Sequence, residues 1–163
     1  MKTILLLLAV IAVAQAGVTL TLSSDDIEAF LKAHNDVRNA LDIPSLEWDT
    51  KLADFAGDWT SRCVFEHSDG PYGENLYASS PLTNNVTYLA YNSVESWVEE
   101  LANVDSDWNC IGDSCGHYSQ VVWRDSLHLG CAITQCENNP EIFPNLVSCN
   151  YDPPGNYAGE KPY

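Results

Sequence analysis

Two histidines and two glutamates stand beside apolar stretches of the sequence, where a polar side chain is able to bind or react. They are His67, Glu74, Glu100 and His117. At about 100° per residue of helix, Glu100 lies about 60° from Trp97, so its carboxylate can lean toward an apolar helix face. Neutral imidazoles and carboxylates are ligands for Zn²⁺. The same groups also satisfy one another as a hydrogen-bonded cluster without an ion, and no compact motif such as HExxH chooses between the two.

Ser119 adds a hydrolase to these alternatives. It lies two residues after His117 in a stretch rich in β-forming residues, and residues two apart on a strand share a face. A serine, a histidine and a glutamate can form a nucleophilic constellation, and Glu74 with Glu100 could act as the paired carboxylates of a glycosidase. No GxSxG elbow is present, and nothing marks an oxyanion hole. We therefore predict no catalytic residue and no enzyme, with a metal-dependent hydrolase or protease as an alternative.

The charge of the chain limits its partners. The sequence has 7 Lys and Arg against 23 Asp and Glu, a net charge of -16. The negative electrostatic field of a chain with this net charge repels nucleic acid and anionic membranes. We expect no nucleic-acid partner and no stable membrane insertion.

The first residues are typical of an export signal. Lys2 is followed by an apolar run over residues 4–13 and by the small-residue sequence Ala14-Gln15-Ala16. The run is shorter than the roughly 20 residues that cross a membrane. We predict a signal peptide over residues 1–16, and one secreted domain over residues 17–163. In an exported chain, the sequon that begins at Asn85 is a candidate glycosylation site.

Six cysteines follow the predicted signal. An even number in an exported chain predicts three disulfides, although the sequence alone does not choose among the many pairings. No CxxC pair is present, which disfavours a zinc-thiolate site.

The first half of the sequence has helical periodicity. Ser23 or Ser24 can cap a first helix, whose apolar stripe includes His34, so we interpret His34 as a core histidine with satisfied hydrogen bonds. Asp49 can cap a second helix, and residues 84–101 predict a third. Between the second and third, the turn residues around Gly73 predict a loop.

The second half changes to the periodicity of strands. Residues 118–123, 128–134 and 146–151 are rich in β-forming residues or alternate in polarity. Helices first and strands later indicate an α+β domain with an antiparallel meander. The tail, residues 152–163, holds several Pro and Gly residues and predicts an irregular, extended segment.

Four sequence elements carry a resemblance to a known family. They are HNDVR at residues 34–38, GENL at residues 73–76, GHYSQVVW at residues 116–123, and LVSCNYDPPGNY at residues 146–157. In this order they resemble the signatures of the CAP superfamily (SCP/TAPS proteins), and most of all plant PR-1 pathogenesis-related proteins and their fungal relatives. The resemblance implies a three-layer α-β-α sandwich with a central antiparallel sheet. It also implies three disulfides: Cys63–Cys136, Cys110–Cys115 and Cys131–Cys149.

The resemblance implies that the two histidines and two glutamates lie together in one cavity. In CAP proteins two histidines and two glutamates line a cavity that can hold a divalent metal, and His67, Glu74, Glu100 and His117 match that tetrad. No cofactor is expected to be required, and Zn²⁺ or another divalent metal is the candidate ion.

The resemblance also implies a binding function. CAP relatives in plants and fungi bind sterols or fatty acids outside the cell, so we expect a secreted, monomeric protein that binds a small lipid or sterol in defence or host–pathogen interaction. The loop linked to sterol binding corresponds to residues 102–110, which keep one aromatic residue, Trp108. This residue either lines a lipid groove or packs under the Cys110–Cys115 bridge. The tail at residues 154–163 resembles the pattern from which plants release a short defence-signalling peptide, so a precursor of such a C-terminal peptide is an alternative function.

Overall fold

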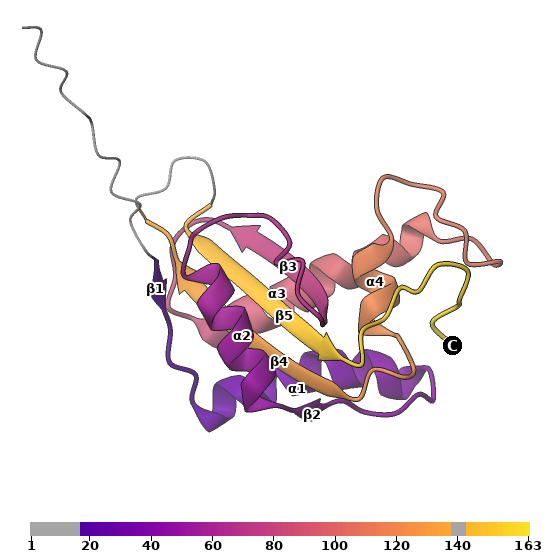
Figure 1. Ribbon diagram of the computed structural model, residues 1–163, viewed down its shortest axis with the longest axis horizontal. Helices are drawn as coiled ribbons and strands as arrows, with labels where there is room; N and C mark the ends of the chain where they lie inside the picture. Colours follow the sequence, from indigo (N-terminus) through magenta and orange to yellow (C-terminus); the bar gives the residue numbers. More distant parts are fainter. Residues whose placement is uncertain (1–16, 138–142) are drawn as a thin grey trace, which may run out of the picture.

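The computed structural model describes residues 17–137 and 143–163 (Figure 1). The predicted signal peptide lies outside these residues. The sheet contains β1 (Val18–Thr19), β4 (His128–Gln135), β5 (Asn145–Asp152) and β3 (Gly73–Ser79), in that order. These strands are antiparallel to one another. A short strand, β2 (Glu47–Trp48), pairs with β4 in parallel.

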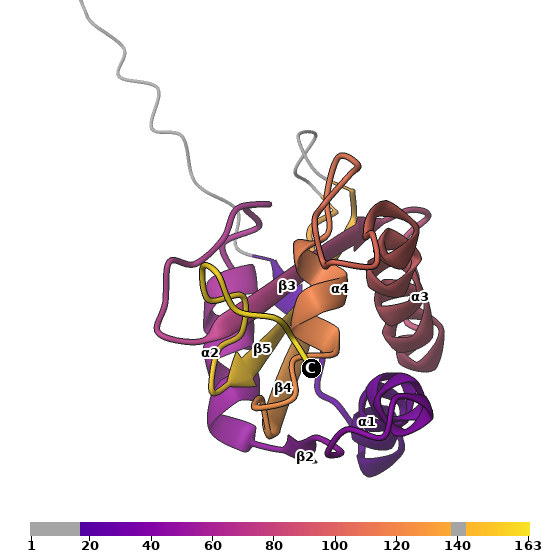
Figure 2. The same cartoon turned by 90° about the vertical axis from the view of Figure 1, so that its right-hand side faces the viewer.

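Helices cover both faces of the sheet, which confirms the predicted three-layer α-β-α sandwich. Figure 2 shows α2 (Thr50–Thr60) on one side, and α1 (Ser24–Ala40) and α3 (Val86–Glu99) on the other. The short helix α4 (Gly116–Val121) lies on the side of α3 and contacts both α3 and β3. A single turn of 3-10 helix, η1 (Glu100–Asn103), continues α3.

The central strands are buried on both faces. Leu129, Cys131 and Ile133 of β4 join the core with α1 and α3, while the alternate residues of this strand face α2. Gly130 is one of these alternate residues, and a Cβ there would overlap Leu52 Cβ and the backbone of α2. The absent side chain allows α2 to pack directly on the strand.

Local signals begin the three long helices, and those of α1 and α2 are the caps that the sequence predicts. Ser23 caps α1 in a reciprocal capping box with Asp26. Asp49 caps α2 by accepting a hydrogen bond from the backbone of Lys51. Asn85 caps α3 in the same way, through Tyr88 N–H.

Two predicted elements are wrong. Residues 118–123 were expected to form a strand, but they belong largely to α4, and His117 lies in this helix and does not open a strand. Tyr118 and Val121, three residues apart, enter the core from one side of the helix. The region of Gly73 was expected to be a loop, but it begins β3, which pairs with β5 along its whole length. A Cβ at Gly73 would overlap the side-chain amide of Gln120 of α4, which hydrogen bonds with Ser126 and Gly155 hold in place.

Three disulfides join the pairs that the resemblance implied. Cys63–Cys136 ties the end of α2 to the end of β4, Cys131–Cys149 connects β4 with β5, and Cys110–Cys115 closes the short loop before α4. Within the part of the chain that the structure describes, no helix has the length and apolarity to cross a membrane.

Candidate functional site

The four predicted residues form two histidine–glutamate pairs. His67, in the loop after α2, donates from Nδ1 to Glu74 Oε1 of β3 over 2.8 Å. His117, near the beginning of α4, donates from Nδ1 to Glu100 Oε1 of η1 over 2.7 Å. In each pair the carboxylate accepts the Nδ1 proton, which leaves Nε2 of a neutral imidazole with a lone pair. Neither Nε2 atom has a hydrogen-bond partner among the described residues.

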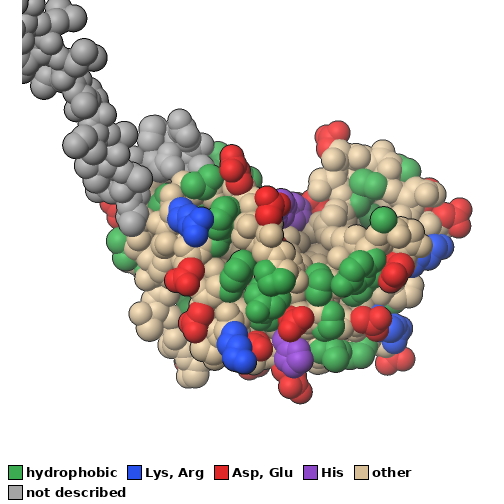
Figure 3. All heavy atoms as spheres, in the orientation of Figure 1, with side chains coloured by type: hydrophobic (Ala, Val, Ile, Leu, Met, Phe, Trp, Pro, Cys, Tyr) green, Lys and Arg blue, Asp and Glu red, His purple; other side chains and the backbone are tan. Residues whose placement is uncertain are grey.

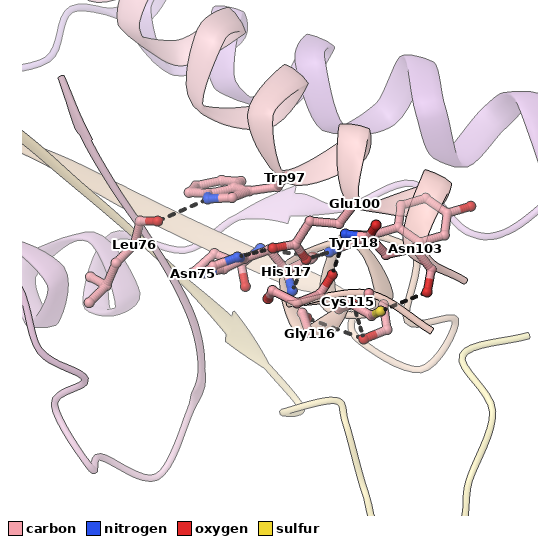
Figure 4. A network of polar contacts seen from close by, with 12 residues as sticks. Asn75, Leu76, Trp97, Glu100, Asn103, Cys115, Gly116, His117 and Tyr118 are labelled. Carbon is pink, nitrogen blue, oxygen red and sulfur yellow. Dashed lines mark hydrogen bonds and ion pairs between the residues drawn. The ribbon is translucent and has the colours of Figure 1, made fainter. Parts of the chain in front are cut away.

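Asn75 connects the strand of one pair with the helix of the other. It follows Glu74 on β3, and its Nδ2 donates to the backbone carbonyl of His117 over 3.0 Å (Figure 4). The ring of His117 stacks on Trp97, with 6.2 Å between ring centroids, and Trp97 Nε1 donates to Leu76 O of β3 over 3.0 Å. Figure 3 shows a hollow of the molecular surface in which a histidine lies beside acidic side chains.

Glu100 is a helix cap as well as a partner of His117. Its second oxygen, Oε2, accepts the backbone N–H groups of His117 at 2.9 Å and Tyr118 at 3.2 Å, at the first turn of α4. Burial acts to raise the pKa of Glu100, but hydrogen bonds from His117, Ser114 and the Tyr118 N–H outweigh it, and the pKa is lowered from its ordinary value. Both oxygens of this carboxylate are therefore used within the protein.

Glu74 differs because one of its oxygens is free. Oε1 accepts from His67 Nδ1 and from the Ser68 N–H at 3.0 Å. Oε2 is buried and has no hydrogen-bond partner among the described residues. The Glu74 side chain is 6% exposed, whereas its partner His67 is 59% exposed. A buried carboxylate oxygen without a hydrogen-bond partner destabilises the fold. A cation or a hydrogen-bond donor that binds beside Glu74 Oε2 would remove this cost, so this atom is the best candidate contact for a ligand in the site.

The donor chemistry of the two pairs fits a divalent metal in part. A carboxylate that accepts the Nδ1 proton of a histidine orients Nε2 for a metal. However, within residues 17–137 and 143–163, no three His, Cys, Asp or Glu side chains are grouped closely enough to hold a metal ion. A zinc site therefore stays a prediction, with the two Nε2 atoms and Glu74 Oε2 as its free donors.

The serine–histidine constellation is not assembled. The expected shared face of Ser119 and His117 depended on a strand, but on the helix α4 these residues lie about 160° apart. The Ser119 hydroxyl donates to Asn156 Oδ1 over 2.6 Å and is near the carbonyl of Cys115 at 3.0 Å. It is therefore held by the C-terminal tail, away from a general base.

Trp108 packs against aromatic residues. Its ring stacks on Tyr118, with centroids 5.9 Å apart, and meets the edge of Tyr163 at 5.0 Å. Asp105 shapes the loop by accepting the backbone N–H groups of Asp107 and Asn109. The predicted lipid-loop residue thus contacts α4 and the last residue of the chain.

A groove beside α2 was not identified from the sequence. Its volume is about 770 Å³, and it lies between the segment 19–22, the beginning of α1, β2 and α2. Its apolar lining includes Leu20, Leu22, Ile27, Trp48 and Ala53. The only local signal was the pair of small residues Ala53 and Gly57, one helical turn apart on α2, which leaves room beside the helix.

Asn85 is exposed, and its side-chain oxygen is used as the cap of α3. Its amide nitrogen, the atom to which a glycan would be attached, is not needed for the cap. The structure is therefore compatible with the sequon, and glycosylation stays a prediction.

Comparisons with known proteins agree on one family. Residues 31–151 match the CAP family, described as the cysteine-rich secretory protein family. Pathogenesis-related protein 1 of Arabidopsis thaliana is 42% identical over 145 residues, which cover 86% of this chain and 84% of that protein. Pathogenesis-related protein 1A of Nicotiana tabacum is 44% identical over 140 residues, covering 82% and 79%. The solved structure of NaASP2 with Zn²⁺ is similar with a TM-score of 0.74 and 25% identity, covering 86% of each chain.

Proposed function

Because the chain belongs to the CAP family of cysteine-rich secretory proteins, we propose that it is a secreted protein of defence or host interaction that binds a small lipid or sterol. Its relatives are named as pathogenesis-related proteins, which supports a role in defence. Three disulfides are typical of proteins exported to an oxidising compartment, which supports secretion.

The observation that carries the binding proposal is the groove beside α2. Its volume of about 770 Å³ is within the range of roughly 300–1,000 Å³ that is usual for small-molecule sites. Leu20, Leu22 and Ile27 give it an apolar wall, and Asp54 and Asp58 supply polar groups along α2. The hydroxyl-bearing residues Thr19, Thr21, Thr50 and Ser61 also line the groove. A groove with an apolar wall and a polar side suits an amphiphile whose body contacts the wall and whose polar end meets the hydroxyls, the carboxylates or water.

A substitution in the groove tests this function. A Cβ at Gly57 would lie 3.5 Å from Thr19 Cγ2 and 3.7 Å from Ala132 Cβ, which is ordinary contact. The backbone therefore accepts a Cβ at this position, and because Gly57 lines the groove, we expect the longer side chain of Gly57→Leu to occupy part of it. We expect wild-type protein to take up labelled cholesterol or palmitate saturably at micromolar concentration, and Gly57→Leu to bind at least tenfold more weakly.

Ser96→Leu is the matched control, because Ser96 is an exposed residue of α3 outside the groove. It should bind like wild type. If the wild-type protein takes up neither lipid, the binding function is wrong. If Gly57→Leu binds as tightly as Ser96→Leu, the groove is not the site.

The free Glu74 Oε2 favours a second ligand, a divalent metal held by His67 and His117. When bound, such an ion would supply positive charge and Lewis acidity at the two pairs. The likeness to a structure solved with Zn²⁺ supports this proposal. In a calorimetric titration with ZnCl₂, both His67→Ala and His117→Ala should lose the binding heat of wild type, and identical heats would exclude these residues as ligands.

A further inference from the structure

The C-terminal tail, residues 153–163, is docked on α4. It leaves the end of β5 and runs beside this helix to the end of the chain (Figures 1 and 2). The contacts begin at its first residues: Ser126 Oγ donates to Pro153 O over 2.7 Å, and Gly155 N–H donates to Gln120 Oε1 over 2.9 Å. A Cβ at Gly155 would lie 2.7 Å from Trp123 Cγ, so the backbone of the tail rests directly on this ring.

Asn156 holds the beginning of α4. Its Oδ1 accepts from Ser119 Oγ over 2.6 Å, and its Nδ2 donates to Gly116 O over 2.9 Å. The residue has a φ of 60°, a left-handed conformation that asparagine adopts more readily than most residues. One side chain thus connects the tail with the residues on both sides of His117.

The far end of the tail is also fixed. Arg124 N–H donates to the carbonyl of Pro162 over 2.8 Å, and Pro162 is buried. The rings of Tyr157 and Trp123 meet with centroids 6.1 Å apart. Together with the contact between Tyr163 and Trp108, these interactions hold the tail at residues 153–157 and again at residues 162–163.

α4 needs such support because it is very short. It has 6 residues, whereas isolated helices below about 12–15 residues are marginal in water. Glu100 satisfies N–H groups at one end, and Arg38 Nη1 donates to Val121 O near the other over 2.9 Å. The tail adds hydrogen bonds between Asn156 and both Gly116 and Ser119, and between Gly155 and Gln120.

We propose that residues 153–163 form a strap that holds α4 in place and thereby positions His117 against Glu100. Asn156 is the main positioning residue of this strap. Displacement of the strap loosens α4 and separates the His117–Glu100 pair, while the sheet and the disulfides stay intact. The strap is independent of the groove beside α2, so an absence of lipid binding would not contradict this proposal.

The test compares two substitutions in the tail of the full-length mature protein. Asn156→Gly removes both side-chain hydrogen bonds to α4 and keeps a residue that tolerates a positive φ. Glu160→Ala is the matched control, because Glu160 is exposed and no side-chain hydrogen bond or ion pair involves it among the described residues. Hydrogen exchange of the α4 amides should be at least tenfold faster in Asn156→Gly, with exchange in β4 and β5 unchanged. The NMR signals of the His117 ring should shift in this variant alone.

A chain that ends at Asp152 provides the second arm. It should show the same fast exchange in α4, and addition of a synthetic peptide of residues 153–163 should slow the exchange again. If the shortened chain does not fold, the comparison of Asn156→Gly with Glu160→Ala in the full-length protein tests the proposal on its own. The strap is wrong if α4 exchange and the His117 signals in Asn156→Gly equal those in Glu160→Ala.

Discussion

His34 is the histidine whose role the structure defines most completely. It is fully buried, and its Nδ1 lies 2.8 Å from the carbonyl of Phe30. Since a carbonyl only accepts, Nδ1 carries the proton and Nε2 accepts from the Tyr151 hydroxyl, also at 2.8 Å. The expected core histidine with satisfied hydrogen bonds is confirmed. Burial lowers the pKa of His34 to about 4, because a charged ring would lose its hydration.

This lowered pKa predicts a loss of stability in weak acid. The unfolded chain binds a proton at His34 below its ordinary pKa of 6.5, whereas the folded protein does so only near a pKa of about 4. The contribution of His34 to the free energy of unfolding is therefore fully present above pH 6.5. It decreases by about 3 kcal/mol as the pH falls from 6.5 to 4. Urea unfolding at pH 7, 5.5 and 4 measures this decrease.

His34→Gln is the control for the carboxylates that titrate in the same range. Glutamine keeps hydrogen-bonding groups but takes up no proton, so the fall in stability between pH 6.5 and 4 should shrink by about 3 kcal/mol in this variant. An equal decrease in both proteins would mean that His34 does not contribute.

The sequence predicts which residues form the candidate site, but it does not predict how they contact one another. The four residues were identified by resemblance to a family, and no local spacing joined them. The pairing of His67 with Glu74 depends on β3, and the cap formed by Glu100 depends on α4. The sequence predicts a loop in place of β3 and a strand in place of α4, so it could not predict how the four side chains are paired.

Among the secondary-structure elements, those specified by local signals were predictable. α1 and α2 begin at caps that are visible in the sequence, at Ser23 and Asp49. The element β3 exists because it pairs with β5, more than 60 residues away along the chain. The helix α4 includes the strand-favouring residues Tyr118 and Val121, and tertiary contacts from Glu100, Arg38 and the tail override their preference. Neither cause is visible in a short window of sequence.

The cap on α4 gives a prediction at this scale. Glu100→Ala removes the acceptor of two backbone N–H groups and the partner of His117. We expect a loss of about 2 kcal/mol in the free energy of unfolding, at the upper end for helix caps because the carboxylate is partly buried. Chemical denaturation at pH 7 measures the change.

Glu99→Ala serves as the comparison, because Glu99 is the neighbouring residue, is exposed and has no side-chain hydrogen bond or ion pair among the described residues. Its stability should stay within about 0.5 kcal/mol of wild type. Equal losses in the two variants would contradict the capping role of Glu100.

For the molecule as a whole, two of the three disulfides, Cys63–Cys136 and Cys110–Cys115, join segments that are not neighbouring strands of the sheet. Cys63–Cys136 spans 73 residues of sequence, and Cys110–Cys115 spans 5. Chain-entropy considerations predict that the longer loop stabilises the fold by about 2 kcal/mol more than the shorter one. Replacing each pair by alanines should therefore lower the melting temperature much more for Cys63–Cys136. A larger effect of the Cys110–Cys115 pair would contradict this order.

The groove beside α2 lies where the segment 19–22, β2 and two helices meet. Its lining residues come from distant parts of the sequence, from Thr19 to Ala132, and the long disulfide and the sheet hold those parts together. The groove is thus a property of the whole fold, and the sequence could not reveal it. Trp108, for which the sequence left open a lipid contact or a packing role, packs against Tyr118 and Tyr163.

Photolabelling with a light-activated cholesterol analogue, followed by mass spectrometry of peptides, tests the binding site most directly. We predict saturable labelling of residues 19–22 and 53–61, which line the groove, and its loss when unlabelled cholesterol is added in excess. Labelling confined to residues 102–110 around Trp108, or no saturable labelling anywhere, would contradict a lipid site beside α2.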